Sequence, residues 1–142
     1  MRLDVILVLG GGVPQSLEEP PIYVQQRCDD AAAIVQQRQQ QQQHRLLPSR
    51  QGLLPILCLS AGTAHLPQLL APNGLPVWES VSSAAYLQQK HGLGRNTDGA
   101  LPQVLVETTS YDTIGNAFYA RTSFTDIIGW RRILVITNEV SE

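Results

Sequence analysis

One short segment of the sequence crowds acid, hydroxyl and amide side chains together. It runs from Glu107 to Asn116 and also contains Ser110 and Thr113. An apolar run precedes it and a helical pattern follows, so N–H groups at the helix start would attract a phosphate or carboxylate. Helix capping explains one or two of these side chains but not all of them. Glu107 is therefore our candidate general acid or base, with Ser110 and Asn116 orienting a substrate.

Three consecutive glycines, Gly10 to Gly12, end the first apolar run of the sequence. Glycine allows positive φ angles and leaves backbone N–H groups uncovered, so the turn can hold an anion. A plain tight turn is the alternative. The dinucleotide-binding pattern G-x-G-x-x-G fails at Gln15, and no Gly-Lys-Ser/Thr is present for a phosphate-binding loop. The glycines therefore predict a ligand site without specifying the ligand.

A second turn of small residues, Ser60 to Thr63, follows the second apolar run. Ser60 is not the nucleophile of a G-x-S-x-G motif, because that motif is absent. His65 lies close by in the sequence and is either an acid–base group or a solvated loop histidine. The turn is a second candidate wall of a site, or a simple connection.

Three glutamates stand near the ends of expected strands or helices: Glu79, Glu107 and Glu139. Two carboxylates that converge on one pocket can share a proton or hold a divalent cation. Each can also be a cap or a surface charge, and Glu79 opens a helix, where negative charge is favourable. Glu107 and Glu139 follow buried strands, where a charge without a role is rare.

The apolar pattern predicts how these groups are positioned. Strands alternate with helices, which is typical of a parallel α/β sheet with helices on both faces. We expect a Rossmann-like sheet of four strands in the order 3-2-1-4, with the ligand where the strand order reverses, between strands 1 and 4. The expected strands are 3–9, 55–60, 103–108 and 133–137, and the expected helices are 20–43, which includes a glutamine tract, 79–91, and one capped by Ser110 or Asp112.

The order of these motifs resembles the domain of unknown function 218 family, the SanA/YdcF/ElyC-like proteins. The resemblance spans nearly the whole chain, and the Glu/Ser/Thr/Asn block is its most specific part. The motifs are VLGGG at 8–12, Arg-x-x-x-Ala at 27–31, Ser-Ala-Gly-Thr at 60–63, Glu-Ser at 79–80, E-x-x-S-x-x-T-x-x-N-A at 107–117 and VITNE at 135–139.

The resemblance implies a Rossmann-like fold with a polar pocket at the strand ends. Members of the family are tied to bacterial envelope integrity, and one is associated with S-adenosylmethionine, which makes this compound a candidate cofactor. The residues that the resemblance and the turns assign to the pocket are Gly10, Gly11, Gly12, Arg27, Ser60, Gly62, Glu79, Glu107, Ser110, Thr113, Asn116 and Thr137.

Two departures from the family pattern stand out. Ala61 replaces a glycine of the second turn, and the histidine and arginine expected after Glu139 are absent. We therefore expect one domain, residues 1–142, that lacks the C-terminal part of the family domain. Its fourth strand is apolar enough to be central, yet it would keep an uncovered edge, which invites pairing or aggregation.

Composition narrows the function class. The net charge of −2 and the scattered basic residues argue against a nucleic-acid partner. Cys28 and Cys58 lack the spacing of zinc ligands, and a reduced, cytoplasmic setting fits buried free thiols. No apolar segment reaches the roughly 20 residues needed to span a bilayer, so we expect a cytoplasmic protein or one whose N-terminal anchor is missing from this sequence. Nothing in the sequence indicates an oligomeric state or predicts a metal.

These observations predict a domain that binds a small anionic or nucleotide-like molecule. One alternative is a hydrolase or group-transfer enzyme that acts on an anionic or envelope lipid-linked substrate. The other is an inactive fragment, or one that depends on a partner.

Overall fold

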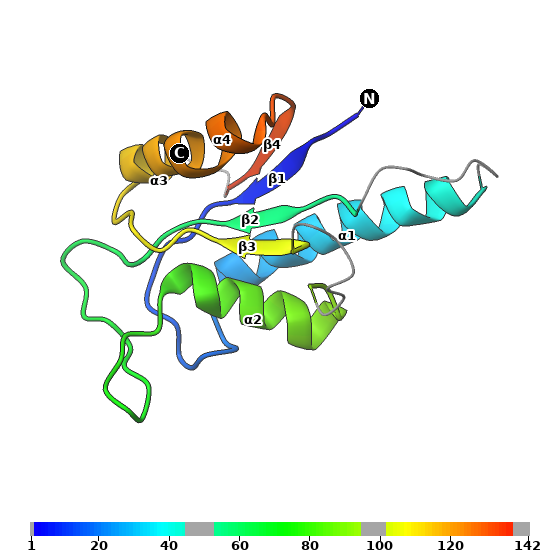
Figure 1. Ribbon diagram of the computed structural model, residues 1–142. Coiled ribbons are helices and arrows are strands. Elements are labelled where there is room, and N and C mark those ends of the chain that lie inside the picture. Colours follow the sequence, from blue (N-terminus) through cyan, green and yellow to red (C-terminus); the bar gives the residue numbers. More distant parts are fainter. Residues whose placement is uncertain (1, 45–52, 95–101, 138–142) are drawn as a thin grey trace, which may run out of the picture.

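Four parallel strands form the centre of the computed structural model, which describes residues 2–44, 53–94 and 102–137. The strand order is β3-β2-β1-β4, as predicted, so the reversal point lies between β1 and β4 (Figure 1). Leu7 of β1 is level with Leu57 of β2 and Val135 of β4. The strands are β1 (Val5–Val8), β2 (Ile56–Cys58), β3 (Val104–Val106) and β4 (Ile133–Ile136).

Helices cover both faces of this sheet, which confirms the predicted Rossmann-like α/β architecture (Figure 1). On one face lie α1 (Ile22–His44) and α2 (Glu79–His91). On the other lie α3 (Thr113–Ala120), the π-helical turn η1 (Arg121–Thr125) and α4 (Asp126–Ile128). Alternate strand residues face opposite layers: Ile6 packs toward α1 and α2, and Leu7 packs toward Ala120 of α3.

The strands are shorter than the apolar runs that predicted them, because the residues at their ends enter turns. Ser60, expected to close β2, has a φ of 100°, which no strand residue adopts. Helix α2 has the predicted bounds and stops at Gly92, whose φ of 68° suits a glycine cap. Asp112 caps α3 by accepting a hydrogen bond of 2.5 Å from the Gly115 N–H.

Helix α1 continues through the glutamine tract, as predicted. Its last buried residue is Val35, and the residues from Gln36 to Gln41 are exposed or half-exposed. This part of α1 extends past the end of the sheet (Figure 1). We call residues 36–44 of α1 the overhang.

Strand β4 lies at the edge of the sheet, where the predicted order placed it despite its apolar sequence, and β1 is its only neighbouring strand among the described residues. The side chain of Val135 is 50% exposed, whereas its neighbour Leu7 on β1 is 7% exposed. The Asp4 carboxylate accepts the N–H groups of Arg131 and Arg132 at 2.8 and 2.9 Å. These hydrogen bonds hold the start of β4 and lower the pKa of Asp4.

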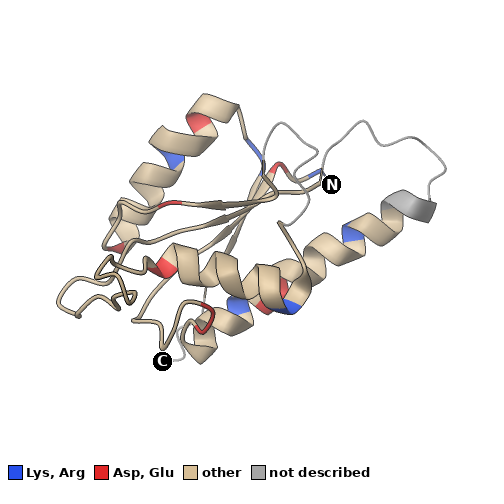
Figure 2. Ribbon diagram, turned by 60° about the horizontal axis from the view of Figure 1, so that its bottom comes forward, with Lys and Arg blue, Asp and Glu red and all other residues tan. Residues whose placement is uncertain are grey.

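Among the described residues, charged side chains lie on the helices and loops and not in the strands. Acidic and basic residues are interspersed along the helices, and the strands carry none (Figure 2). Within the described ranges, no helix is both long and apolar enough to cross a membrane.

Candidate functional site

The turn after β1 needs glycine at two of its three positions. A Cβ on Gly10 would lie 2.4 Å from the Leu59 carbonyl oxygen, because the turn after β2 passes against it. Gly12 has a φ of 99°, and a Cβ there would lie 2.1 Å from the Tyr23 hydroxyl. At Gly11 the nearest atom would be an Arg27 nitrogen, 3.9 Å away. Close packing therefore explains why positions 10 and 12 are glycine. It gives no steric reason for a glycine at position 11.

Glu79 joins the turns after β1 and β2. It is 4% exposed, so the structure corrects its interpretation as a surface charge at a helix start. Its two carboxylate oxygens accept hydrogen bonds from the hydroxyls of Ser60 and Thr63, each at 2.8 Å. The Thr63 hydroxyl in turn accepts the Gly12 N–H at 3.0 Å. Through Thr63, the glycine turn is fixed to the carboxylate.

Glu107 joins the turns after β2 and β3, and it is 2% exposed. One carboxylate oxygen accepts the N–H groups of Thr109 and Ser110 at 2.5 and 2.8 Å. The other contacts the Ser110 hydroxyl and accepts the Ser60 N–H at 3.4 Å. Both oxygens are therefore used within the fold, which gives Glu107 a positioning role; its catalytic role stays a prediction.

Asn116 completes the Glu107 network. Its side-chain oxygen lies 2.5 Å from the Ser110 hydroxyl, which also contacts Glu107. A hydroxyl has one proton, so it donates to only one of two acceptors. Turning the Asn116 amide so that its nitrogen donates to Ser110 satisfies all three groups. The predicted trio of Glu107, Ser110 and Asn116 is thus brought together.

The remaining predicted residues are placed differently. Gly62 is buried in the turn after β2, where a Cβ would lie 2.0 Å from the Gln68 side-chain nitrogen. Thr113 and Thr137 are exposed and do not join either network. His65 is exposed with a φ of 74°, and Glu139 lies outside the described residues.

Arg27 lies behind the glycine turn, on the first turns of α1. Its side chain is buried, and burial lowers its pKa, although an arginine remains charged at neutral pH. One guanidinium nitrogen donates to the carbonyl oxygens of Leu9 and Gly10, at 2.6 and 3.3 Å. The guanidinium also lies over the Tyr23 ring, 5.4 Å from its centroid. Sequence analysis did not assign Tyr23 to the site.

The N–H groups of Gly10 and Gly11 have no hydrogen-bond partner among the described residues. Each belongs to a peptide whose carbonyl accepts from Arg27, and in a trans peptide the N–H points opposite to the carbonyl. Both N–H groups therefore point away from the guanidinium. A cation on the carbonyl oxygen polarises a peptide, which makes its N–H a stronger donor.

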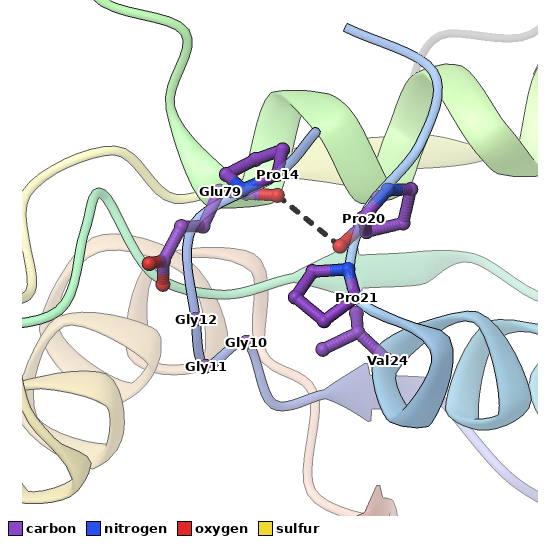
Figure 3. Close-up of a pocket in the computed structure, with 9 residues that line it drawn as sticks. Gly10, Gly11, Gly12, Pro14, Pro20, Pro21, Val24 and Glu79 are labelled. Carbon is purple, nitrogen blue, oxygen red and sulfur yellow. Dashed lines mark hydrogen bonds between the residues drawn. The ribbon is translucent and has the colours of Figure 1, made fainter. Parts of the chain in front are cut away.

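A small hollow lies beside these N–H groups (Figure 3). Its empty volume is about 150 Å³, open solvent included, and its centre is too narrow for a water molecule. In Figure 3 the carboxylate of Glu79 lies to one side of the glycine turn, and the start of α1 lies to the other. The lining residues are Gly10, Gly11, Gly12, Pro14, Pro20, Pro21, Val24, Glu79 and Ser83.

Sequence reasoning missed two groups of this site. Thr63 carries the hydroxyl that links Gly12 to Glu79, and Pro20 and Pro21 form the wall opposite that carboxylate. The signal for Thr63 was its place as the last residue of the second small-residue turn, Ser60 to Thr63. Among the described residues, no cluster of three or more histidine, cysteine or acidic side chains is arranged to hold a metal ion.

In comparisons with known proteins, no family model, curated protein or solved structure matches this chain. The resemblance to the domain of unknown function 218 family therefore stays a prediction.

Proposed function

We propose that this chain binds a small ligand through an anionic group at the turn after β1. The observation that carries the proposal is the pair of N–H groups of Gly10 and Gly11. They have no partner among the described residues, and the carbonyls of the same peptides accept hydrogen bonds from Arg27. The turn lies at the reversal point of a parallel sheet, where such folds bind ligands.

Helix α1 supports an anion at the same place. It begins at Ile22, and Pro20 and Pro21 before it line the hollow beside the glycines. The positive end of the helix dipole is therefore directed at the hollow, and it adds to the charge of Arg27.

Glu79 limits the class of ligand. A second anion next to its carboxylate would be repelled, so the part of the ligand that faces Glu79 carries a hydroxyl or an ammonium group. A phosphate or carboxylate at Gly10 and Gly11 with a donor toward Glu79 fits a sugar phosphate, a nucleotide or the amino acid end of S-adenosylmethionine.

The size of the hollow points to a small group or to one end of a larger ligand. Sites for whole drug-sized molecules usually measure about 300–1,000 Å³, whereas this hollow, as the structure has it, has no room even for a water molecule, so a bound group has to widen it. Binding of a complete nucleotide or of S-adenosylmethionine would thus leave most of the molecule outside the hollow or widen it.

Calorimetric titration with inorganic phosphate, ribose 5-phosphate, adenosine monophosphate and S-adenosylmethionine tests the proposal. Arg27→Met is expected to weaken binding about tenfold, because the Leu9 and Gly10 carbonyls lose the charged donor that holds the turn and polarises the N–H groups of the same peptides. Arg38→Met, in the overhang of the same helix, is the matched control and should bind like the original protein.

Two results would count against the proposal. One is the absence of binding by any of these compounds to protein that is folded by circular dichroism. The other is equal binding by the Arg27 and Arg38 variants, which would move the anion away from the turn.

A further inference from the structure

The two buried glutamates of the site differ in how much of their hydrogen-bonding capacity the fold uses. An ionised carboxylate has about four positions at which it accepts a hydrogen bond. Glu107 receives four donors, namely three backbone N–H groups and the Ser110 hydroxyl. Glu79 receives two donors, the hydroxyls of Ser60 and Thr63, and no other among the described residues. About half of the capacity of Glu79 therefore remains for a ligand.

Glu79 also lacks a positively charged partner. It is 4% exposed, and none of the ion pairs among the described residues includes it. A buried carboxylate without a pair is rare, because neutral hydroxyls only partly replace the water that it loses. Its place at the start of α2 supplies the partial positive charge of the helix dipole. A full positive charge is still missing, and a cationic group on the ligand would supply it.

This carboxylate lies close to the N–H groups of the proposed anion site. One Glu79 oxygen accepts from the Thr63 hydroxyl, which accepts the N–H of Gly12. Two hydrogen bonds thus separate the carboxylate from the glycine turn, and Figure 3 shows the Glu79 side chain beside that turn. Glu79 and the glycines line the same hollow. A ligand that contacts both needs an anionic group and a donor only a few bonds apart.

We infer that the ligand is a small zwitterion, whose anionic group lies on the N–H groups of Gly10 and Gly11 and whose primary ammonium group donates to Glu79. This inference rests on the proposed anion site and narrows the donor to an ammonium group. An ammonium group carries three N–H donors and a full charge, whereas a hydroxyl carries one donor and no charge. Glu79 then determines the specificity of the site, with Ser60 and Thr63 as positioning residues.

Two classes of small molecule have this chemistry. In an α-amino acid the anion is a carboxylate, and in an aminoalkyl phosphate it is a phosphate. Both hold the two charges within a few bonds of each other. The hollow is too narrow for a water molecule as it stands, so a short ligand of either class would widen it least.

Calorimetric titration of the full chain with two matched pairs of compounds tests this inference. L-Alanine and L-lactate share a carboxylate, and O-phosphoethanolamine and 2-hydroxyethyl phosphate share a phosphate. Within each pair, only the ammonium and the hydroxyl differ. In one pair the ammonium compound should bind about tenfold more tightly, because its charge lies opposite a buried carboxylate. The pair that shows this preference identifies the anion as a carboxylate or a phosphate.

Glu79→Gln keeps the size of the side chain and removes its charge, so the two compounds of that pair should bind about equally. The matched control is Asp126→Asn, an exposed carboxylate in α4 on the other face of the sheet, and it should keep the preference. The comparison within each pair needs no variant, so it decides the inference even if Glu79→Gln does not fold.

Three results would overturn the inference. They are equal binding within both pairs, tighter binding of the hydroxyl compounds, and a preference that persists in folded Glu79→Gln protein. Inorganic phosphate separates this inference from the proposed function. If phosphate binds and no pair shows a preference for ammonium, the anion site stands and this inference alone is wrong. If none of the five compounds binds, both are wrong.

Discussion

Adjacent glycines at the candidate site differ in what surrounds them. Gly10 is pressed against the backbone of Leu59, whereas a Cβ on Gly11 would meet only an Arg27 nitrogen at 3.9 Å, an ordinary contact distance. The two glutamates differ in their hydrogen-bond donors. Glu107 accepts from backbone N–H groups, whereas the donors to Glu79 among the described residues are hydroxyls. Residue type alone does not distinguish these roles. The stability of variants substituted at these positions does.

Gly10→Ala is expected to lower the free energy of unfolding by about 1–3 kcal/mol, because the new methyl group overlaps a backbone oxygen. Gly11→Ala should change it by less than about 0.5 kcal/mol. Urea denaturation of both variants measures the difference. Equal losses would mean that the turns after β1 and β2 are farther apart in solution than in the structure.

Glu107→Gln is expected to destabilise the fold by about 1–3 kcal/mol, because an NH₂ group would replace an oxygen that accepts hydrogen bonds. Glu18→Gln, at an exposed position, is the control and should shift stability by less than about 0.5 kcal/mol. Thermal unfolding gives both values. A variant as stable as the original protein would remove the positioning role and favour a catalytic one.

At the scale of elements, a polar cluster joins α1 to α2 on the face away from α3. Asp29 of α1 accepts from Tyr86 and Lys90 of α2 at 2.8 and 3.2 Å, and it lies 2.7 Å from His91. Partial burial raises the pKa of Asp29, but the hydrogen bonds from these three residues outweigh it and keep the pKa below its usual value. The ionised carboxylate therefore holds the two helices together.

Asp29→Asn should destabilise the protein at about pH 6 and lose most of that effect by about pH 3. A carboxylate with a lowered pKa contributes stability above its unfolded value, near 3.8, and loses it as pH falls through the lower folded value. Because Asp29 is partly exposed, the contribution is modest. Urea denaturation of both proteins across this pH range measures it, and a difference that stays constant with pH would contradict the assignment.

The elements themselves could be predicted from the sequence, and their contacts could not. Alternation of strands and helices predicted the parallel sheet, and the Rossmann-like order 3-2-1-4 and the helix expected at 79–91 agree with the structure. The hydrogen bond from Gly12 to Thr63 spans 51 residues and depends on the φ angles of two loops. Local sequence patterns do not determine such angles. Both turns could therefore be predicted to line a site, but the hydrogen bond between them could not.

At the scale of the whole molecule, both cysteines lie in one core layer with α1 and α2. Burial raises the pKa of Cys28 to about 12 and raises the pKa of Cys58 well above its usual value. Since only the thiolate attacks a disulfide reagent, neither cysteine is reactive while the core is intact.

Ellman's reagent should therefore find no reactive thiol in the native protein and two in concentrated guanidinium chloride, which matches the two cysteines of the sequence. Fast modification of either thiol in buffer would show that the layer between the sheet and α1 opens locally. The sequence placed Cys28 in the first expected helix and Cys58 inside a buried strand, and both are buried free thiols in the structure.

The overhang of α1 can change in length without a change in the core. The glutamine repeat lies after Val35, the last residue of α1 that packs in the core among those whose side chains are described. One added glutamine advances the end of the helix by about 1.5 Å and turns it by about 100°, while all earlier residues keep their register. Variants with a longer or shorter glutamine repeat should thus share one core and one ligand site.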